Sequence, residues 1–378
     1  MGRPVVVFDT ATPQFQRNQV FNYEYASRFP GAAVWALLHG EVTKRGWDMV
    51  TSDVFVQCSR LEPAVCISEM VTPYTRAVLR AGAIPAVIVS GESPNVAWRF
   101  YSRLSRHVAP YAHAFLFRGA EAWVKPPTRF HPVYWANSRS AVFPGIPWEK
   151  RRLLVMVAGN KQRIAPPGGG PTARARWLAK RLLWRYLRLA NPIFRFEDLY
   201  TKRLEAIRYF AGKEDFQLYG VGWDRPGGVG RPYLEAARLA GARPVYDKVK
   251  AMSGFKFAVA FENCTFPGYV TEKIFDCFFA GCIPIYYGAP DISDFVPQEA
   301  FIDFRRFTGF EDLQRYLRDI SPAETKRYRD SASAFLESPG FNRFRESVFV
   351  HELLCLVGHT GSLCDVSTLP ADGQSRAL

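Results

Sequence analysis

The stretch from Phe255 to Phe307 constrains the fold of this chain more than any other part of the sequence. Two short apolar runs within it, Phe257–Phe261 and Ile283–Tyr287, have the length and residue types of buried strands. A segment with helical character, from Thr271 to Ala280, separates them, and Gly281 is a suitable helix stop. A strand, a helix and a second strand in succession predict a parallel sheet covered by helices.

The same alternation occurs elsewhere in the chain, and its 378 residues suggest two domains. In the first part we expect strands at Val5–Phe8, Asp53–Val56 and Ile84–Val89, with helices at Ala33–Gly46 and Thr72–Arg80. In the second part we expect strands at Leu153–Ala158 and Gln217–Gly220, with a helix at Tyr200–Ala211. Each part therefore has the pattern of an α/β domain.

Five prolines between residues 125 and 148 mark the passage between the two domains. We expect an N-terminal domain over residues 1–130, a linker over 131–150, a C-terminal domain over 151–345 and a C-terminal tail over 346–378. Within the C-terminal domain, residues 161–196 are predicted to be a basic insertion.

Polar residues follow the strand Phe257–Phe261 directly, because Glu262 and Asn263 stand at its carboxyl end. Ligands of open parallel sheets bind outside these strand ends. The next helix opens with Glu272 and Lys273, and a helix N-terminus with a lysine suits a diphosphate. The alternative from spacing alone is a solvated lysine beside a glutamate that favours any first helical turn.

Three blocks in this region resemble one known family. They are Phe257–Asn263 (FAVAFEN), Tyr269–Lys273 (YVTEK) and Ile283–Pro290 (IPIYYGAP), and Phe301–Asp303 continues the pattern. Their order and spacing are similar to the C-terminal signature of the α-1,3-fucosyltransferases, glycosyltransferase family 10. The resemblance implies an α/β GT-B fold, in which two Rossmann-like domains have parallel sheets facing a central cleft. It also implies a C-terminal domain that binds GDP-fucose and an N-terminal domain on the acceptor side.

The resemblance assigns donor-binding roles to residues at matching positions. Glu272 and Lys273 match the family's donor-binding pair, Tyr269 matches a tyrosine near the nucleotide, and Arg203 matches an arginine that contacts the diphosphate. Asn160 matches the asparagine of a Ser-Asn pair, although Gly159 replaces the serine, and Lys248 matches a lysine before the signature strand. With Glu262 and Asn263, these residues form the predicted donor site.

The resemblance also implies an inverting transfer, in which a carboxylate base deprotonates the acceptor hydroxyl. Glu92 matches this base, just after the strand Ile84–Val89, and a base must reach the hydroxyl within hydrogen-bond distance. The alternative is that Glu92 only caps a turn before Pro94. The family's pattern handles donor charge with Arg203 and Lys273, and no Asp-x-Asp triplet occurs, so no metal or other cofactor is expected.

The formal charge of +14 is partly local, because Lys161 to Arg195 contains nine basic residues and no acidic one. The predicted helix over residues 173–189 places leucines and tryptophan against arginines and lysines. Such a helix can lie on an anionic membrane surface. A solvated helix packed on its own domain is the alternative, and a nucleic-acid partner is disfavoured because no recognised binding motif occurs.

Other features narrow the class of protein. No run of eighteen apolar residues or signal-peptide pattern occurs, and the seven cysteines include no C-x-x-C pair. We therefore expect a cytoplasmic protein, or one peripheral on the cytoplasmic membrane face. A Rossmann oxidoreductase is disfavoured because no G-x-G-x-x-G follows the first strand.

The expected activity is fucosyl transfer from GDP-fucose to a glycan or a lipid-linked oligosaccharide. Two alternatives remain: a transferase of the same fold that uses another nucleotide sugar, and a catalytically inactive, membrane-associated binding protein.

Overall fold

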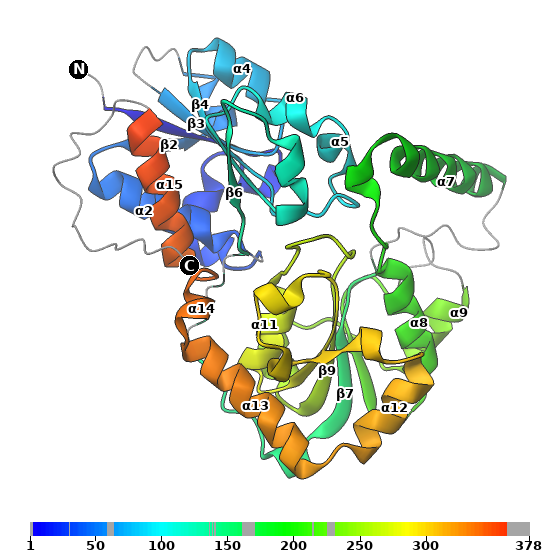
Figure 1. Cartoon of the computed structure of the whole chain (residues 1–378). Coiled ribbons are helices and arrows are strands. Elements are labelled where there is room, and N and C mark those ends of the chain that lie inside the picture. The colour runs from blue at the N-terminus through cyan, green and yellow to red at the C-terminus, as the bar shows by residue number, and fades with distance from the viewer. Residues whose placement is uncertain are drawn as a thin grey trace.

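The computed structural model of the protein describes residues 3–29, 31–58, 64–135, 137, 139, 141–160, 171–213, 215–224 and 231–360. These residues build two sheets, one from each half of the chain, with helices packed around them (Figure 1). Every paired strand of both sheets is parallel. The predicted α/β class with two parallel sheets is confirmed.

The first sheet has the order β2-β1-β3-β4-β5-β6. Its strands are β1 (Val5–Asp9), β2 (Asp48–Thr51), β3 (Ala64–Glu69), β4 (Ile84–Val89), β5 (His113–Leu116) and β6 (Arg129–Pro132). Its helices are α1 (Tyr23–Ala26), α2 (Ala33–Lys44), α3 (Ser52–Phe55), α4 (Thr75–Arg80), α5 (Trp98–Tyr101) and α6 (Leu104–Val108). All of β1 is buried, since helices cover both faces of a parallel sheet and its apolar run packs on each side.

The second sheet has the order β11-β10-β9-β7-β8. Its strands are β7 (Arg152–Val157), β8 (Phe216–Tyr219), β9 (Phe255–Phe261), β10 (Ile283–Tyr287) and β11 (Ile302–Asp303). The helices of this half are α7 (Pro171–Ala190), α8 (Tyr200–Phe210), α9 (Arg231–Leu239), α10 (Lys248–Met252), α11 (Glu272–Phe279), α12 (Phe310–Asp319), α13 (Pro322–Glu337) and α14 (Pro339–Asn342). The central strand β9 lies between β10 and β7, so its carboxyl end is in the middle of the sheet.

One strand prediction is wrong. The run Asp53–Val56 was expected to be a strand, but the strand here is β2, and residues from Ser52 to Phe55 form α3. The Asp53 carboxylate accepts a hydrogen bond from the backbone N–H of Arg17, 2.9 Å away. An aspartate in a first helical turn is favourable, and an apolar run of three residues does not distinguish a strand from a short helix.

The segment expected to be a C-terminal tail begins as a helix, α15 (Glu346–Thr360). This helix packs on α2 and β4 of the first domain (Figure 1). The Phe349 ring lies 6.3 Å from the Trp35 ring and 5.6 Å from the Phe115 ring, between centroids. The apolar side chains of α15 recur at helical spacing and are buried in the core of the first domain. The chain therefore returns to the first domain after α14. Residues 361–378 of the expected tail lie outside the described residues.

The basic insertion packs against the first domain, and not only against the second sheet. Leu187 near the end of α7 is buried, and Trp184 packs with its ring centroid 5.8 Å from Phe194 and 6.1 Å from Phe196. Phe196 in turn lies 6.2 Å from Phe266. Leu187, Phe194, Phe196 and Phe266 belong to the same hydrophobic cluster as the core of the N-terminal domain, and Trp184 packs against that cluster. Residues 161–170 of the insertion lie outside the described residues.

Candidate active site

The centre of the candidate site is the turn that joins β9 to α11. Glu262, directly after β9, is fully buried. Its carboxylate accepts hydrogen bonds from the backbone N–H of Thr271 at 2.8 Å and from the Thr271 hydroxyl at 2.9 and 3.0 Å. Thr271 precedes the first residue of α11, so Glu262 ties the start of the helix to the end of the strand. Gly288 makes room for this arrangement, because a Cβ there would lie 2.5 Å from the Glu262 Cγ.

Lys273 completes this arrangement with a positive charge. Its Nζ donates to Glu262 Oε2 at 3.0 Å and to the Thr271 hydroxyl at 2.7 Å, and lies 3.7 Å from Glu272 Oε1. Burial alone would lower the pKa of Lys273, but the carboxylates of Glu262 and Glu272 raise it above its usual value. The lysine is therefore a fixed cation at a helix N-terminus, with a quarter of its side chain exposed.

Two further charges extend the cluster along α11. Lys248 Nζ lies 3.8 Å from Glu272 Oε1 and 3.1 Å from Asp276 Oδ2. Burial would raise the pKa of Glu272, but Lys273 and Lys248 outweigh it and hold the pKa at about 2. Burial also raises the pKa of Asp276, against the opposing effect of Lys248. Glu272 is thus held ionised between two lysines.

Arg203, Asn263 and Tyr269 form a second, adjoining network. The Arg203 guanidinium donates to the Phe261 carbonyl through Nε at 3.0 Å and Nη2 at 2.6 Å, and Nη2 also donates to Asn263 Oδ1 at 3.0 Å. The Asn263 amide donates to the Tyr269 hydroxyl at 2.8 Å. Arg203 is positioned from α8, whose start is docked on β9 because the Leu199 N–H donates to the Asn263 carbonyl. The charge of Arg203 also acts on Lys273, so the two networks are neighbours.

The loop after β4 brings the first domain to this site. The Asn95 side-chain amide donates to the Asn263 carbonyl, 2.9 Å away, across the two halves of the chain. The Glu92 carbonyl accepts a hydrogen bond of 3.0 Å from the Tyr101 hydroxyl, which orients the backbone of the loop. Burial raises the pKa of Tyr269, and the carboxylates of Glu262 and Glu92 raise it further, so the charge of Glu92 lies close enough to act on Tyr269.

The structure therefore brings seven of the nine candidate residues into networks of hydrogen bonds and ion pairs: Arg203, Lys248, Glu262, Asn263, Tyr269, Glu272 and Lys273. Glu92 lies near them, since its charge acts on Tyr269. Asn160 lies at the neighbouring strand end, where its side-chain amide donates to the Gly222 carbonyl at 2.9 Å and its N–H to the Val221 carbonyl. The fully buried Glu262 carboxylate contacts Lys273 and the start of α11 and is not exposed to solvent.

Sequence reasoning missed three polar residues of the site: Thr271, Asp276 and Asn95. Thr271 gave a usable signal, since a threonine before a helical run is a common N-cap residue. Asp276 lies one helical turn after Glu272, on the same face. Asn95 gave no signal, because its partner Asn263 is 168 positions away in the sequence.

Comparisons with known proteins match the segment of the chain that contains most of these residues. Residues 235–331 match the model of the glycosyltransferase family 10 (fucosyltransferase) C-terminal domain. The chain is 41% identical over 70 residues to an α-(1,4)-fucosyltransferase from Arabidopsis thaliana, which covers 18% of each protein. It is 35% identical over 72 residues to GDP-fucose protein O-fucosyltransferase 3 from Xenopus laevis, covering 19% of this chain and 15% of that protein. The matched segment thus spans less than a fifth of either relative.

The fold extends over the whole chain. A solved α-glucosyltransferase in complex with UDP superposes with a TM-score of 0.51 at 10% identity, covering 94% of this chain and all of the other. This likeness shows the arrangement of two domains that glycosyltransferases of the GT-B fold share. The predicted fold and the resemblance in the signature region are confirmed. Residues 235–331 of the second domain therefore match the fucosyltransferase C-terminal domain of glycosyltransferase family 10, in a chain with the GT-B fold.

Proposed function

We propose that this protein is an inverting glycosyltransferase that transfers fucose from GDP-fucose to a hydroxyl of a glycan or lipid-linked oligosaccharide. The observation that supports it best is the fixed Lys273 at the start of α11, joined through Glu262 to β9 and beside the Arg203 network. A diphosphate leaving group, which gains negative charge as its bond to the sugar breaks, needs such preorganised positive charge. The donor sugar follows from the matched fucosyltransferase domain.

In the proposed reaction, the Glu92 carboxylate takes the proton of the acceptor hydroxyl. The acceptor oxygen forms a bond to the anomeric carbon from the face opposite the phosphate. The bond between that carbon and the β-phosphate oxygen breaks, and its electron pair leaves with GDP. Lys273, Arg203 and the N–H groups of the α11 start stabilise the charge on the departing diphosphate. No step needs a metal, so transfer is expected to continue in the presence of EDTA.

A donor screen tests this proposal. GDP-fucose, GDP-mannose and UDP-sugars are compared for binding by calorimetry and for slow hydrolysis in the absence of an acceptor. Preference for GDP-fucose supports the proposal, and preference for a UDP-sugar overturns the donor. Binding of GDP-fucose without hydrolysis or transfer to any glycan of an array favours the inactive binding protein instead.

Two variants separate the roles of the two domains. Lys273→Met is expected to lower both affinity for GDP and transfer, because it removes the cation at the helix start. Glu92→Gln keeps the shape of the side chain and is expected to retain GDP affinity while transfer falls roughly a hundredfold or more, the usual effect of losing a general base. Glu121→Gln, on the surface of the first domain, is the matched control.

We also infer that the protein docks on an anionic membrane surface through α7. Leu178, Leu182, Tyr186 and Leu189 lie on one face of this helix, and each is between 53% and 74% exposed. The opposite side of the helix is attached to the protein through the buried Leu187. No helix among the described residues has the length and apolar character needed to cross a membrane.

Charge favours lipid as the partner of this apolar stripe. Arg185 and Arg188 are exposed beside it, and the segment from Lys161 to Arg195 contains no acidic residue. A basic helix with an exposed apolar face binds anionic lipid in two ways, by burial of its apolar side chains and by electrostatic attraction to the lipid headgroups. The cytoplasmic leaflet carries such lipids, which agrees with the predicted cytoplasmic location.

Vesicle co-sedimentation tests the docking. Binding to phosphatidylserine-containing vesicles, weaker in high salt and absent with neutral phosphatidylcholine, is expected. The variant Leu182→Ser/Leu189→Ser should lose binding. The control Leu239→Ser changes a leucine of similar exposure, 71%, on α9 and should bind normally. Equal sedimentation of both variants would refute the assignment to α7.

A further inference from the structure

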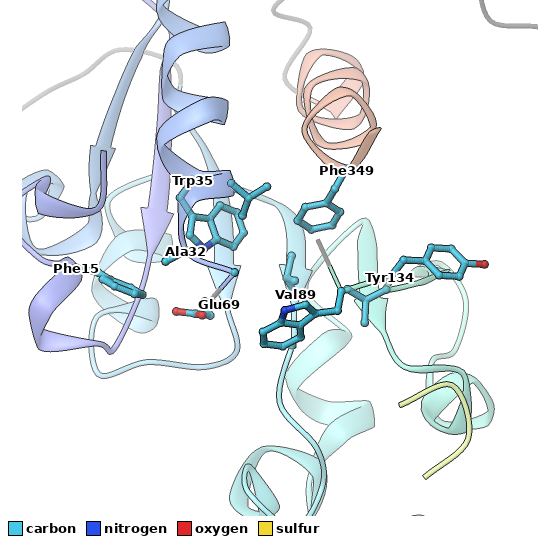
Figure 2. Close-up of a pocket in the computed structure, with 12 residues that line it drawn as sticks. Phe15, Ala32, Trp35, Glu69, Val89, Tyr134 and Phe349 are labelled. Carbon is cyan, nitrogen blue, oxygen red and sulfur yellow. The ribbon is translucent and has the colours of Figure 1, made fainter. Parts of the chain in front are cut away.

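A pocket in the first domain lies at the same sheet edge as Glu92 and takes no part in the donor chemistry. It is bounded by the ends of β3 and β4, by α2, by the residues after β6 and by α15 (Figure 2). Its cavity volume is about 90 Å³, and part of it is open to solvent. A single water molecule needs roughly 10 to 15 Å³, so the cavity has room for a small polar ring but not for a long oligosaccharide.

The walls of the pocket are aromatic. Phe15, Trp35, Trp135 and Phe349 come from four separate parts of the chain and line it together. Figure 2 shows Phe15 and Trp35 on one side and Phe349 on the other. Aromatic rings that line an open pocket offer flat apolar surfaces, which suit the C–H face of a pyranose.

Trp135 is held in place by two glycines. A Cβ on Gly31 would lie 3.1 Å from the Trp135 ring, and a Cβ on Gly91 would lie 3.0 Å from it. Both distances are closer than ordinary contact, so side chains at these positions would displace the indole. Gly91 directly precedes Glu92. The glycines therefore fix a large aromatic surface against the backbone next to the proposed base.

Among the described residues that line the pocket, Glu69 at the end of β3 has the one carboxyl group (Figure 2). Its Oε2 accepts a hydrogen bond from the Thr10 hydroxyl at 2.9 Å. Burial raises the pKa of Glu69, Thr10 opposes the change, and the carboxylates of Glu92 and Asp9 raise the pKa further. A carboxyl group in this setting gains from another hydrogen-bond donor, and a sugar hydroxyl is such a donor.

We propose that this pocket is the acceptor subsite and binds one pyranose ring, with its apolar face on Trp135 and one hydroxyl on the Glu69 carboxyl group. Glu69 pairs in register with Val89, three residues before Glu92, so a ring held by Glu69 lies within reach of the base. A second hydroxyl of the same ring is then presented to Glu92. This inference rests on the proposed transferase function, because it names the substrate that Glu92 deprotonates.

The proposal assigns different roles to the carboxyl groups of Glu92 and Glu69. Glu92 takes the proton from the reacting hydroxyl, whereas Glu69 binds a hydroxyl that does not react. Loss of Glu69 should therefore raise KM for the acceptor much more than it lowers kcat. Loss of Glu92 should do the reverse.

The test is binding of simple pyranosides to the whole chain saturated with GDP. Methyl glucoside, galactoside, mannoside and N-acetylglucosaminide are titrated with tryptophan fluorescence and saturation-transfer NMR as readouts. At least one is expected to bind, and Glu69→Gln and Trp135→Ala should each weaken it roughly tenfold or more. Trp135→Phe keeps an aromatic face and should weaken it less. Glu121→Gln and Trp98→Phe are matched controls outside the pocket and should leave binding unchanged.

The outcomes separate this inference from the proposed function. If GDP-fucose is bound and hydrolysed but no pyranoside binds, or if one binds equally well to Glu69→Gln and Trp135→Ala, the acceptor subsite is overturned and the transferase is not. If pyranosides bind in the pocket but no nucleotide sugar binds anywhere, the pocket is a sugar site and the transferase is overturned. Thermal unfolding and GDP affinity of each variant show whether a loss of binding is local.

Discussion

A double-mutant cycle on Glu262 and Lys273 tests the idea that a buried ion pair holds the start of α11. The two side chains meet at 3.0 Å, with Glu262 fully buried and Lys273 a quarter exposed. At an effective dielectric constant of about 20, the direct attraction is on the order of 5 kcal/mol. Desolvation of both charges opposes this attraction. Because Lys273 keeps part of its hydration, we expect a coupling free energy of about 2 to 3 kcal/mol.

The variants are Glu262→Gln, Lys273→Met and their combination, and the measured quantity is the free energy of unfolding in urea. In the native protein, Thr271 and Lys273 both donate hydrogen bonds to the Glu262 carboxylate. Glu262→Gln replaces one of its oxygens with an amide NH2 group, which would then face another hydrogen-bond donor. Lys273→Met keeps the apolar stem but leaves the Glu262 carboxylate buried without its cation. Each single variant should therefore be strongly destabilised. The loss of unfolding free energy in the double variant should be smaller than the sum of the losses in the two single variants.

The exposed pair of Lys326 and Asp330 on α13 is the control cycle. It is close, 2.5 Å, but its side chains are 69% and 61% exposed. Pairs of this kind contribute about 0.3 to 0.5 kcal/mol. If the Glu262–Lys273 cycle is additive within about 0.5 kcal/mol, as distant sites are, the buried pair does not hold the helix start and the reasoning fails.

Two further predictions concern the same turn. Glu272 has a pKa of about 2 against an ordinary 4.5, so its carboxylate should stabilise the fold by about 3 kcal/mol above pH 4.5. That advantage over Glu272→Gln should be lost as the pH falls from 4.5 toward 2; a gap that stays constant in urea titrations over this range would contradict it. Gly288→Ala should lower stability by about 2 kcal/mol or more, because its Cβ would lie 2.5 Å from Glu262 and from the Tyr286 hydroxyl. Gly40→Ala, inside α2 where no atom lies within 4 Å, should not lower stability, because alanine favours a helix interior over glycine, and equal losses of melting temperature for both variants would refute the steric argument.

The signature region could be predicted well from sequence because its information is local. Each strand is a continuous apolar run, each turn is marked by glycine or proline, and Glu272 and Lys273 follow at a helix start. The same local rules failed at Asp53–Val56, where three apolar residues suit either a strand or a helical turn. Local pattern thus predicts an element only where the run is long enough to decide its period.

The first-domain side of the site depends on contacts that no local pattern contains. Trp135 fell in the expected linker, yet its position is determined by Gly31 and Gly91, more than forty residues away in either case. Phe349 fell in the expected tail, yet it lines the same pocket from α15. These residues have roles only because the chain returns to the first domain after completing the second. Their grouping could not be inferred before the topology was known.

Neighbouring residues at the end of β9 connect the two halves of the proposed reaction. Glu262 points to the helix start and holds Lys273, whereas Asn263 binds Arg203 and Tyr269 and accepts the hydrogen bond of Asn95. Because Asn95 lies three residues after Glu92, the loop that carries the proposed base is attached to the strand end that organises the donor cations. A displacement of this strand end would therefore move base and donor site together. Without the second domain, the loop of Glu92 would lose the contacts that fix it, so positioning of the base requires both domains.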